Sequence, residues 1–170
     1  MRLNLREIIH TPGASLPFAF QMDLSDLEFN GQRPATHPIE VEGVVKNTAG
    51  ALVLEGKAST VLDLTCDRCG KPFSQTQKVS LDTLLATELA DEESEGEIYL
   101  LDGEEADLDE VARTAFILGM DTKHLCSEDC KGLCAKCGAN LNEGPCRCKP
   151  EVDPRLAALA QLLDEKAGAE

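Results

Sequence analysis

The chain has 170 residues, of which 16 are Lys or Arg and 31 are Asp or Glu, so its formal net charge is −15. Apolar residues make up 42% of the chain, which is too many for a chain that is disordered throughout. No run of about 18 apolar residues predicts a membrane span, and the first ten residues lack the apolar core of a signal peptide. We therefore expect a soluble cytoplasmic protein with no membrane partner.

The first 36 residues predict little regular structure. Four apolar residues near the start fit either a short edge strand or one helical turn: Leu3, Leu5, Ile8 and Ile9. Pro12, Gly13 and Pro17 then predict a break in regular structure.

Three strands follow, and we expect them at 38–47, 51–66 and 72–86. In each strand apolar residues alternate with polar ones, so one face of each is expected to be buried. The last two strands are joined by the turn 66–72, which makes a hairpin with a Cys-x-x-Cys sequence at its tip. The pattern predicts an antiparallel β meander with an aliphatic core, since the chain has no Trp, one Tyr and five Phe.

Residues 88–110 hold twelve acidic residues and no Lys or Arg. This stretch is either a solvated loop with a short strand over 98–101 or a surface that binds a basic partner. The candidate partner-binding residues are Glu92, Glu93, Glu95 and Glu97.

Two helices are expected. Asp107 and Glu110 resemble a capping box and begin an amphipathic helix that ends near Gly119. Asp153 and Pro154 begin a second helix at the C-terminal end. The fold class is thus α+β, with a β-sheet domain over 1–120, a cysteine-rich segment over 121–150, and an amphipathic helix and tail over 151–170.

The cysteines are clustered. They are Cys66, Cys69, Cys126, Cys130, Cys134, Cys137, Cys146 and Cys148. In a reducing compartment disulfides rarely persist, so clustered cysteines indicate metal ligation. Two Cys-x-x-Cys-Gly sequences occur, one with Cys66 and Cys69 and the other with Cys134 and Cys137. In such a sequence two thiolates can reach one metal ion and the glycine tolerates a positive φ. Eight ligands predict two structural Zn²⁺ ions, since closed four-thiolate sites suit zinc or iron and leave no open position for catalysis.

The spacing leaves two groupings of the ligands open. The economical grouping places the last four cysteines, which lie within fifteen residues, around one ion. Cys126 and Cys130 then share the other ion with Cys66 and Cys69 at the hairpin tip. A rubredoxin-like alternative joins the two Cys-x-x-Cys pairs directly. His124 can replace a cysteine in either grouping, although a lone histidine is more often a neighbour of such a site.

Enzyme motifs are missing from the sequence. It has no His-x-Glu for a zinc deaminase, no Walker loop and no Gly-x-Ser-x-Gly sequence. The cysteine-rich segment is mildly basic, and Lys131, Lys136 and Arg147 are candidates for contact with phosphates. The alternative is that these cations offset the negative charge of the thiolates.

Several segments together resemble the YceD family of large ribosomal RNA subunit accumulation proteins. They are the sequence 66–73 after a long strand, the acidic stretch, the sequence 125–142 with Cys146-x-Cys148, and the sequence 153–157. One departure is 119–124, which replaces a proline-containing lead into the first cysteine of that segment. The resemblance implies a non-enzymatic factor in ribosome biogenesis with no small-molecule substrate. Its expected partner is a basic large-subunit ribosomal protein or a precursor particle, with ribosomal RNA contacted at the zinc end. The alternatives are a stand-alone RNA-binding zinc module and a zinc or redox sensor.

Overall fold

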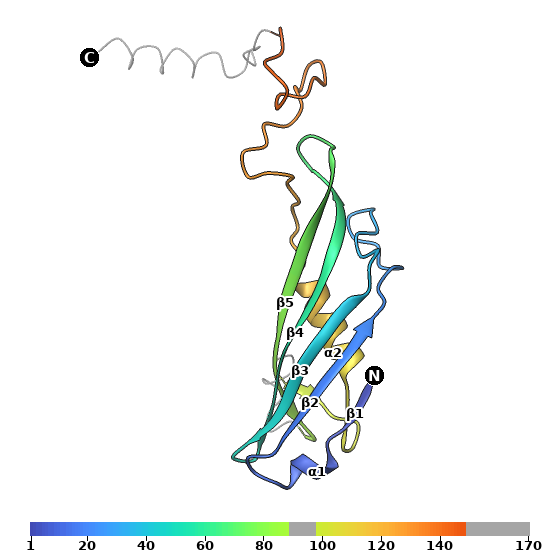
Figure 1. The fold of residues 1–170 in the computed structure, drawn as a ribbon, viewed down its shortest axis with the longest axis vertical. Helices are drawn as coiled ribbons and strands as arrows, with labels where there is room; N and C mark the ends of the chain where they lie inside the picture. Colours follow the sequence, from blue (N-terminus) through green and yellow to red (C-terminus); the bar gives the residue numbers. More distant parts are fainter. Residues whose placement is uncertain (89–97, 149–170) are drawn as a thin grey trace, which may run out of the picture.

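The computed structural model describes residues 1–88 and 98–148. The elements in chain order are β1 (Arg2–Asn4), α1 (Arg6–Ile9), β2 (Ser15–Met22), β3 (Ile39–Thr48), β4 (Ala51–Thr65), β5 (Pro72–Ala86), β6 (Ile98–Leu100), β7 (Glu105–Asp107) and α2 (Leu108–Leu118). Five strands form one sheet in the order β2-β3-β4-β5-β6, and β1 pairs with β7 in a second, two-stranded sheet. The α+β class and the antiparallel meander are confirmed, with α2 lying along one face of the large sheet (Figure 1).

The strands β3, β4 and β5 lie within one residue of their predicted bounds at each end. Most of their apolar residues share one face and form a single core with α2 and the N-terminal segment, whereas Val61 and Leu84 lie on the other face and are exposed. This core includes Val41 and Val45 of β3, Leu54 and Leu62 of β4, and Leu81 and Leu85 of β5. The period-two alternation therefore identified the buried face correctly.

The N-terminal segment is more regular than its sequence predicts. Pro17 lies inside β2, so the expected break at that residue is wrong. Within the described residues β2 is an edge strand, with Pro17 opposite Val44 of β3. An edge strand accommodates proline because the missing N–H can face away from the sheet. The residues before it form both of the expected alternatives, since β1 is a short strand and α1 is one helical turn.

The strand expected over 98–101 is present as β6, but it joins the sheet in parallel to β5, with Ile98 opposite Leu84. This pairing is the exception to the antiparallel meander. The predicted helix after Asp153 lies outside the described residues.

Helix α2 begins at the predicted cap. The Asp107 carboxylate accepts hydrogen bonds from the backbone N–H groups of Asp109 and Glu110. Glu110 does not complete a capping box, because its carboxylate accepts a hydrogen bond from the Tyr99 hydroxyl at 2.8 Å. The helix buries Leu108, Val111, Ala112 and Phe116.

Two glycines make room for an aromatic ring in the core. Gly43 of β3 lies opposite Gly56 of β4. A Cβ atom on Gly43 would lie 2.5 Å from the carbonyl oxygen of Glu55 and 2.6 Å from the ring of Phe18. Glycine in these strand interiors thus permits the close approach of Phe18, which is itself buried.

The hairpin of β4 and β5 is longer than the rest of the sheet. Each of its strands has 15 residues, whereas β3 has 10, and β4 loses its β3 partner beyond Ser59. The end of the hairpin therefore projects from the sheet and meets the segment that follows α2 (Figure 1). This projection positions the first pair of cysteines.

Candidate metal centres

The two Cys-x-x-Cys-Gly sequences fold in the same way. The N–H of Gly70 donates to the carbonyl of Cys66 at 2.8 Å, and the N–H of Gly138 donates to the carbonyl of Cys134 at 2.8 Å. Both glycines have a φ of 70°. Since this left-handed conformation favours glycine, each turn depends on the residue that follows its second cysteine.

The eight cysteines gather into two groups of four, all with free thiols. The first quartet is Cys66, Cys69, Cys126 and Cys130, and the second quartet is Cys134, Cys137, Cys146 and Cys148. Within each quartet all sulfur atoms lie within 4.8 Å of one another. This is the economical grouping, and the rubredoxin-like alternative does not form.

The sulfur separations fit a tetrahedral metal site. In the first quartet the Sγ atoms of Cys66 and Cys130 are 3.8 Å apart, and those of Cys69 and Cys126 are 3.7 Å apart. Four thiolates at a Zn–S distance of about 2.3 Å have sulfur atoms about 3.8 Å apart. A disulfide would require about 2.05 Å. The donor set and the spacing therefore fit an ion such as Zn²⁺, held by four thiolates with no open position.

The electrostatics of the quartets also favour a cation. The backbone N–H of Cys126 donates to the sulfur of Cys66 and lowers the pKa of that thiol to about 6. The backbone N–H of Cys137 likewise lowers the pKa of Cys134 to about 6. Burial raises the pKa of Cys126 to about 12, and the hydrogen bond with the Cys137 thiol raises that of Cys148 to about 12. Desolvation and the hydrogen bonds between neighbouring thiols thus oppose full ionisation of each quartet, and a divalent ion would offset the charge of four thiolates.

Hydrogen bonds tie the hairpin tip to the cysteine-rich segment. The backbone N–H of His124 donates to the Asp67 carboxylate at 2.6 Å, and the N–H of Asp67 donates to the carbonyl of His124 at 2.9 Å. The Arg68 guanidinium donates to the carbonyl of Cys130 at 2.7 Å, and the carbonyl of Arg68 accepts from the N–H of Leu133 at 3.1 Å. The first quartet therefore joins two parts of the chain that are far apart in sequence.

The imidazole of His124 belongs to neither quartet. Its ring packs edge-on against Phe29, with the ring centroids 6.4 Å apart. Its Nε2 atom is buried and has no hydrogen-bond partner among the described residues. His124 is therefore a neighbour of the first quartet through its backbone.

The candidate partner-binding residues are only partly placed. Lys131, Lys136 and Arg147 are exposed in the cysteine-rich segment. Glu92, Glu93, Glu95 and Glu97 lie outside the described residues.

The sequence interpretation missed Asn142, whose side-chain N–H donates to the sulfur of Cys130 at 3.4 Å. The one feature of the sequence that could have indicated such a contact is the presence of two asparagines, Asn140 and Asn142, between Cys137 and Cys146.

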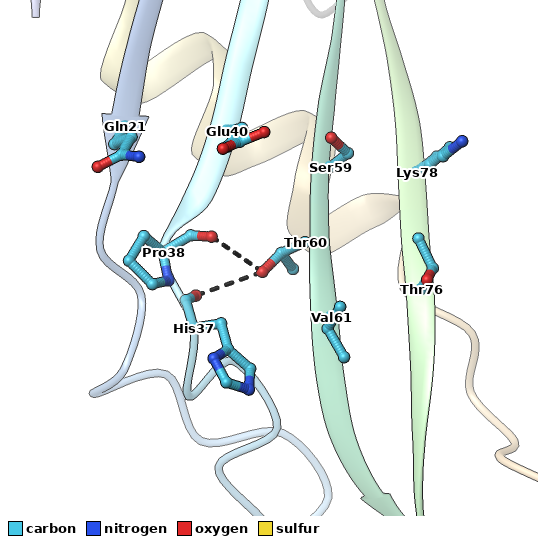
Figure 2. A pocket seen from close by; sticks show the side chains of 9 residues that line it. All are labelled: Gln21, His37, Pro38, Glu40, Ser59, Thr60, Val61, Thr76 and Lys78. Atoms are coloured by element: carbon cyan, nitrogen blue, oxygen red, sulfur yellow. Dashed lines mark hydrogen bonds between the residues drawn. The ribbon is translucent and has the colours of Figure 1, made fainter.

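A shallow depression of about 460 Å³ lies on the other face of the sheet from α2 (Figure 2). Four of its residues form a row across β2 to β5: Gln21, Glu40, Ser59 and Lys78. At one end the Thr60 hydroxyl donates to the carbonyls of Pro38 at 3.0 Å and His37 at 3.3 Å, which fixes the loop before β3. The depression contains one acid and one lysine, and none of its lining residues is a cysteine.

Beside this depression, Asp63 contacts a histidine and two hydroxyl groups, as in a catalytic triad, but the order of the hydrogen bonds differs from that of a triad. Asp63 lies 3.5 Å from the His37 imidazole and accepts hydrogen bonds from the hydroxyls of Thr36 at 2.6 Å and Ser74 at 2.8 Å. These two hydroxyls lower the pKa of the Asp63 carboxyl. In a triad the histidine lies between the hydroxyl and the carboxylate, so this arrangement does not activate a nucleophile.

Comparison with known proteins identifies the family. The profile described as large ribosomal RNA subunit accumulation protein YceD matches residues 54–163, from β4 through all eight cysteines. The chain belongs to the YceD family. The resemblance that the sequence motifs indicated is thus confirmed.

Two plant proteins of this family are similar to the chain. It is 30% identical over 164 residues to "Large ribosomal RNA subunit accumulation protein YCED homolog 1, chloroplastic" of Zea mays. It is 28% identical over 162 residues to the protein of the same name in Arabidopsis thaliana. These matches cover 78% of the chain but 56% and 50% of the plant proteins, so the chain spans about half their length.

An uncharacterised protein of Mycobacterium tuberculosis is 30% identical over 166 residues, which cover 94% of the chain and 73% of that protein. No solved structure matches the chain. Neither helix in the described part of this YceD protein is long and apolar enough to cross a membrane.

Proposed function

We propose that this YceD protein is a non-enzymatic factor in the accumulation of large-subunit ribosomal RNA and that it carries one structural Zn²⁺ ion in each cysteine quartet. The observation that supports this most strongly is the pair of closed four-sulfur groups within 4.8 Å, one of which joins the hairpin to the later segment. Four protein thiolates leave no coordination position for a substrate, so such ions stabilise structure. The protein is expected to act in the cytoplasm, where thiols stay reduced.

The names of the plant relatives support the biological part of this proposal. They describe those proteins as accumulation proteins of the large ribosomal RNA subunit. The proposal transfers this role to the present chain as a docking function, with a basic large-subunit ribosomal protein or a precursor particle as its partner.

The charge of the chain supports a basic partner. Its net charge of −15 would speed the encounter with a cationic protein. A groove of about 380 Å³ between β5, β6 and α2 has two charged lining residues among those described, Asp82 and Glu110, and both are acidic. Leu118, which also lines this groove, is 80% exposed. The proposed surface is this groove, and from the sequence Glu92, Glu93, Glu95 and Glu97 are proposed to bind the same partner.

The test is recovery of partners from a lysate at increasing salt concentration. The wild-type protein should retain a large-subunit ribosomal protein or precursor particle, and retention should weaken as salt screens the charges. The double variant Asp82→Lys/Leu118→Lys should no longer retain the partner. The control variant Asp26→Lys, which changes an exposed acid outside the groove, should retain it as the wild type does. If the wild type recovers neither kind of partner, the proposal is wrong.

The second candidate is a stand-alone RNA-binding zinc module. The exposure of Lys131, Lys136 and Arg147 at the cysteine-rich end favours it. In that case reversal of these three charges should abolish retention of RNA and leave the contacts with proteins unchanged. Loss of protein contacts in the same variant would instead indicate that this end is part of the protein-docking surface.

A further inference from the structure

The two cysteine quartets are connected by a very short segment. Only residues 131–133 separate Cys130, the last ligand of the first quartet, from Cys134, the first ligand of the second. The loop between Cys137 and Cys146 folds back onto this connection. Leu133 and Asn140 form an antiparallel bridge, and the N–H of Leu141 donates to the carbonyl of Gly132 at 2.9 Å.

Asn142, in the same loop, reaches the first quartet. Its side-chain amide group donates to the sulfur of Cys130 at 3.4 Å and to the side-chain Oδ1 atom of Asn140 at 2.9 Å. The side-chain Oδ1 atom of Asn142 accepts from the backbone N–H of Lys131 at 2.8 Å, which fixes the orientation of the side-chain amide. A loop held at both ends by ligands of the second quartet therefore supplies a hydrogen-bond donor to a ligand of the first.

The shape of the surface agrees with this contact. A cleft of about 370 Å³ beside the first quartet is lined by Cys69, Cys126 and Cys130 and also by Asn140, Asn142 and Glu143. The loop between Cys137 and Cys146 thus contributes to the lining of the cleft beside the first quartet.

A donor at this place has a clear physical effect. Four thiolates around one divalent ion retain a net charge of about −2, and N–H groups that donate to the sulfurs disperse it. Removing partners of this kind from around metal ligands typically lowers metal affinity by about 10- to 100-fold.

We propose that Asn142 is a positioning residue for the first quartet and that through it the two sites bind their metal ions cooperatively. Filling the second quartet orders the 138–145 loop, and this order brings the Asn142 amide to Cys130. The proposal rests on metal binding at both quartets, as proposed above. Because coupling between two binding sites is reciprocal, filling the first quartet must favour the second by the same factor.

The experiment is a double-mutant cycle on the full chain, with thiols kept reduced. The variants are Asn142→Ala, the double variant Cys137→Ser/Cys148→Ser, which disables the second quartet, and all three substitutions together. Affinity of the first quartet is measured with Co²⁺, through the thiolate-to-metal charge-transfer absorption, and with Zn²⁺ in competition with a chelator. Glu143→Gln is the matched control, because Glu143 is in the same loop and its carboxylate contacts Asn140 rather than a sulfur.

We expect Asn142→Ala and the disabled second quartet each to lower the affinity of the first quartet by about 10- to 100-fold. The combined variant should lose little more, because both changes remove the same contact. Independent effects that multiply, or an unchanged affinity in Asn142→Ala, would overturn the inference while leaving zinc binding intact. A wild-type protein that takes up no metal would overturn the proposed function as well.

Discussion

Removing the metal ions proposed for the two quartets should release the cysteine-rich segment and leave the sheet folded. The core of the sheet and α2 form one hydrophobic cluster that contains none of the cysteines. A separate, small cluster contains Cys66, Cys69 and Cys130 with a few partly buried neighbours. Chelation is therefore expected to act on residues 121–148 and on the tip of the hairpin.

The contacts of this segment are too weak to order it alone. Among the described residues it takes part in seven backbone–backbone hydrogen bonds outside helices and strands and in eight that involve a side chain. At about 1 kcal/mol each, these contribute about 15 kcal/mol. Ordering 28 residues costs about 28 kcal/mol even at the low end of about 1 kcal/mol per residue. The proposed Zn²⁺ ions are expected to supply the difference, since a structural Zn²⁺ site contributes about 10–16 kcal/mol.

The assay is backbone hydrogen exchange before and after chelation, with a reductant present throughout. The amides of Asp67, Leu133, Cys134 and Leu141, which are hydrogen-bonded at the cysteine-rich end, should lose their protection. The amides of β3 and β4 inside the sheet should keep theirs. Protection of the segment that survives chelation with all thiols reduced would refute this reasoning.

Two predictions concern the β-sheet domain. Burial and the hydrogen bond to Glu110 raise the pKa of Tyr99, the single tyrosine, to about 12, so its stabilising contribution is present below pH 10 and is lost as the pH rises through about 12. Glu110→Gln should lower this pKa in a tyrosinate absorbance titration, and an unchanged midpoint would contradict the assignment. Gly43→Ala should lower the free energy of unfolding by about 1–3 kcal/mol, because the added methyl group meets Glu55 and Phe18. Urea denaturation tests this, and a midpoint equal to that of the wild type would argue against the close packing.

Much of the sheet could be predicted because its pattern is local. Alternation along β3, β4 and β5 indicates which side chains are buried, whatever their neighbours are. The same holds for the Asp107 cap, which depends on residues two and three positions further along. Pro17 was misread because proline breaks a central strand but not an edge strand, and edge position is a property of the whole sheet.

The grouping of the cysteines could be predicted only in part. The spacing of the cysteines limited the ligand groupings to two, and the choice between them depends on where the hairpin tip lies in space. The contact of Asn142 with Cys130 joins residues of different loops through side-chain geometry, which no sequence period encodes. The parallel pairing of β6 with β5 was also missed, because no local pattern encodes the direction in which a short strand joins a sheet.

The most direct test of the account is the metal content of the protein purified under reducing conditions. Native mass spectrometry with elemental analysis should find two zinc ions per chain, and denaturation in the presence of a chelator should release eight reactive thiols. A protein free of metal, or one whose cysteines are linked as disulfides, would contradict the central claim that two ions hold the cysteine-rich segment on the hairpin.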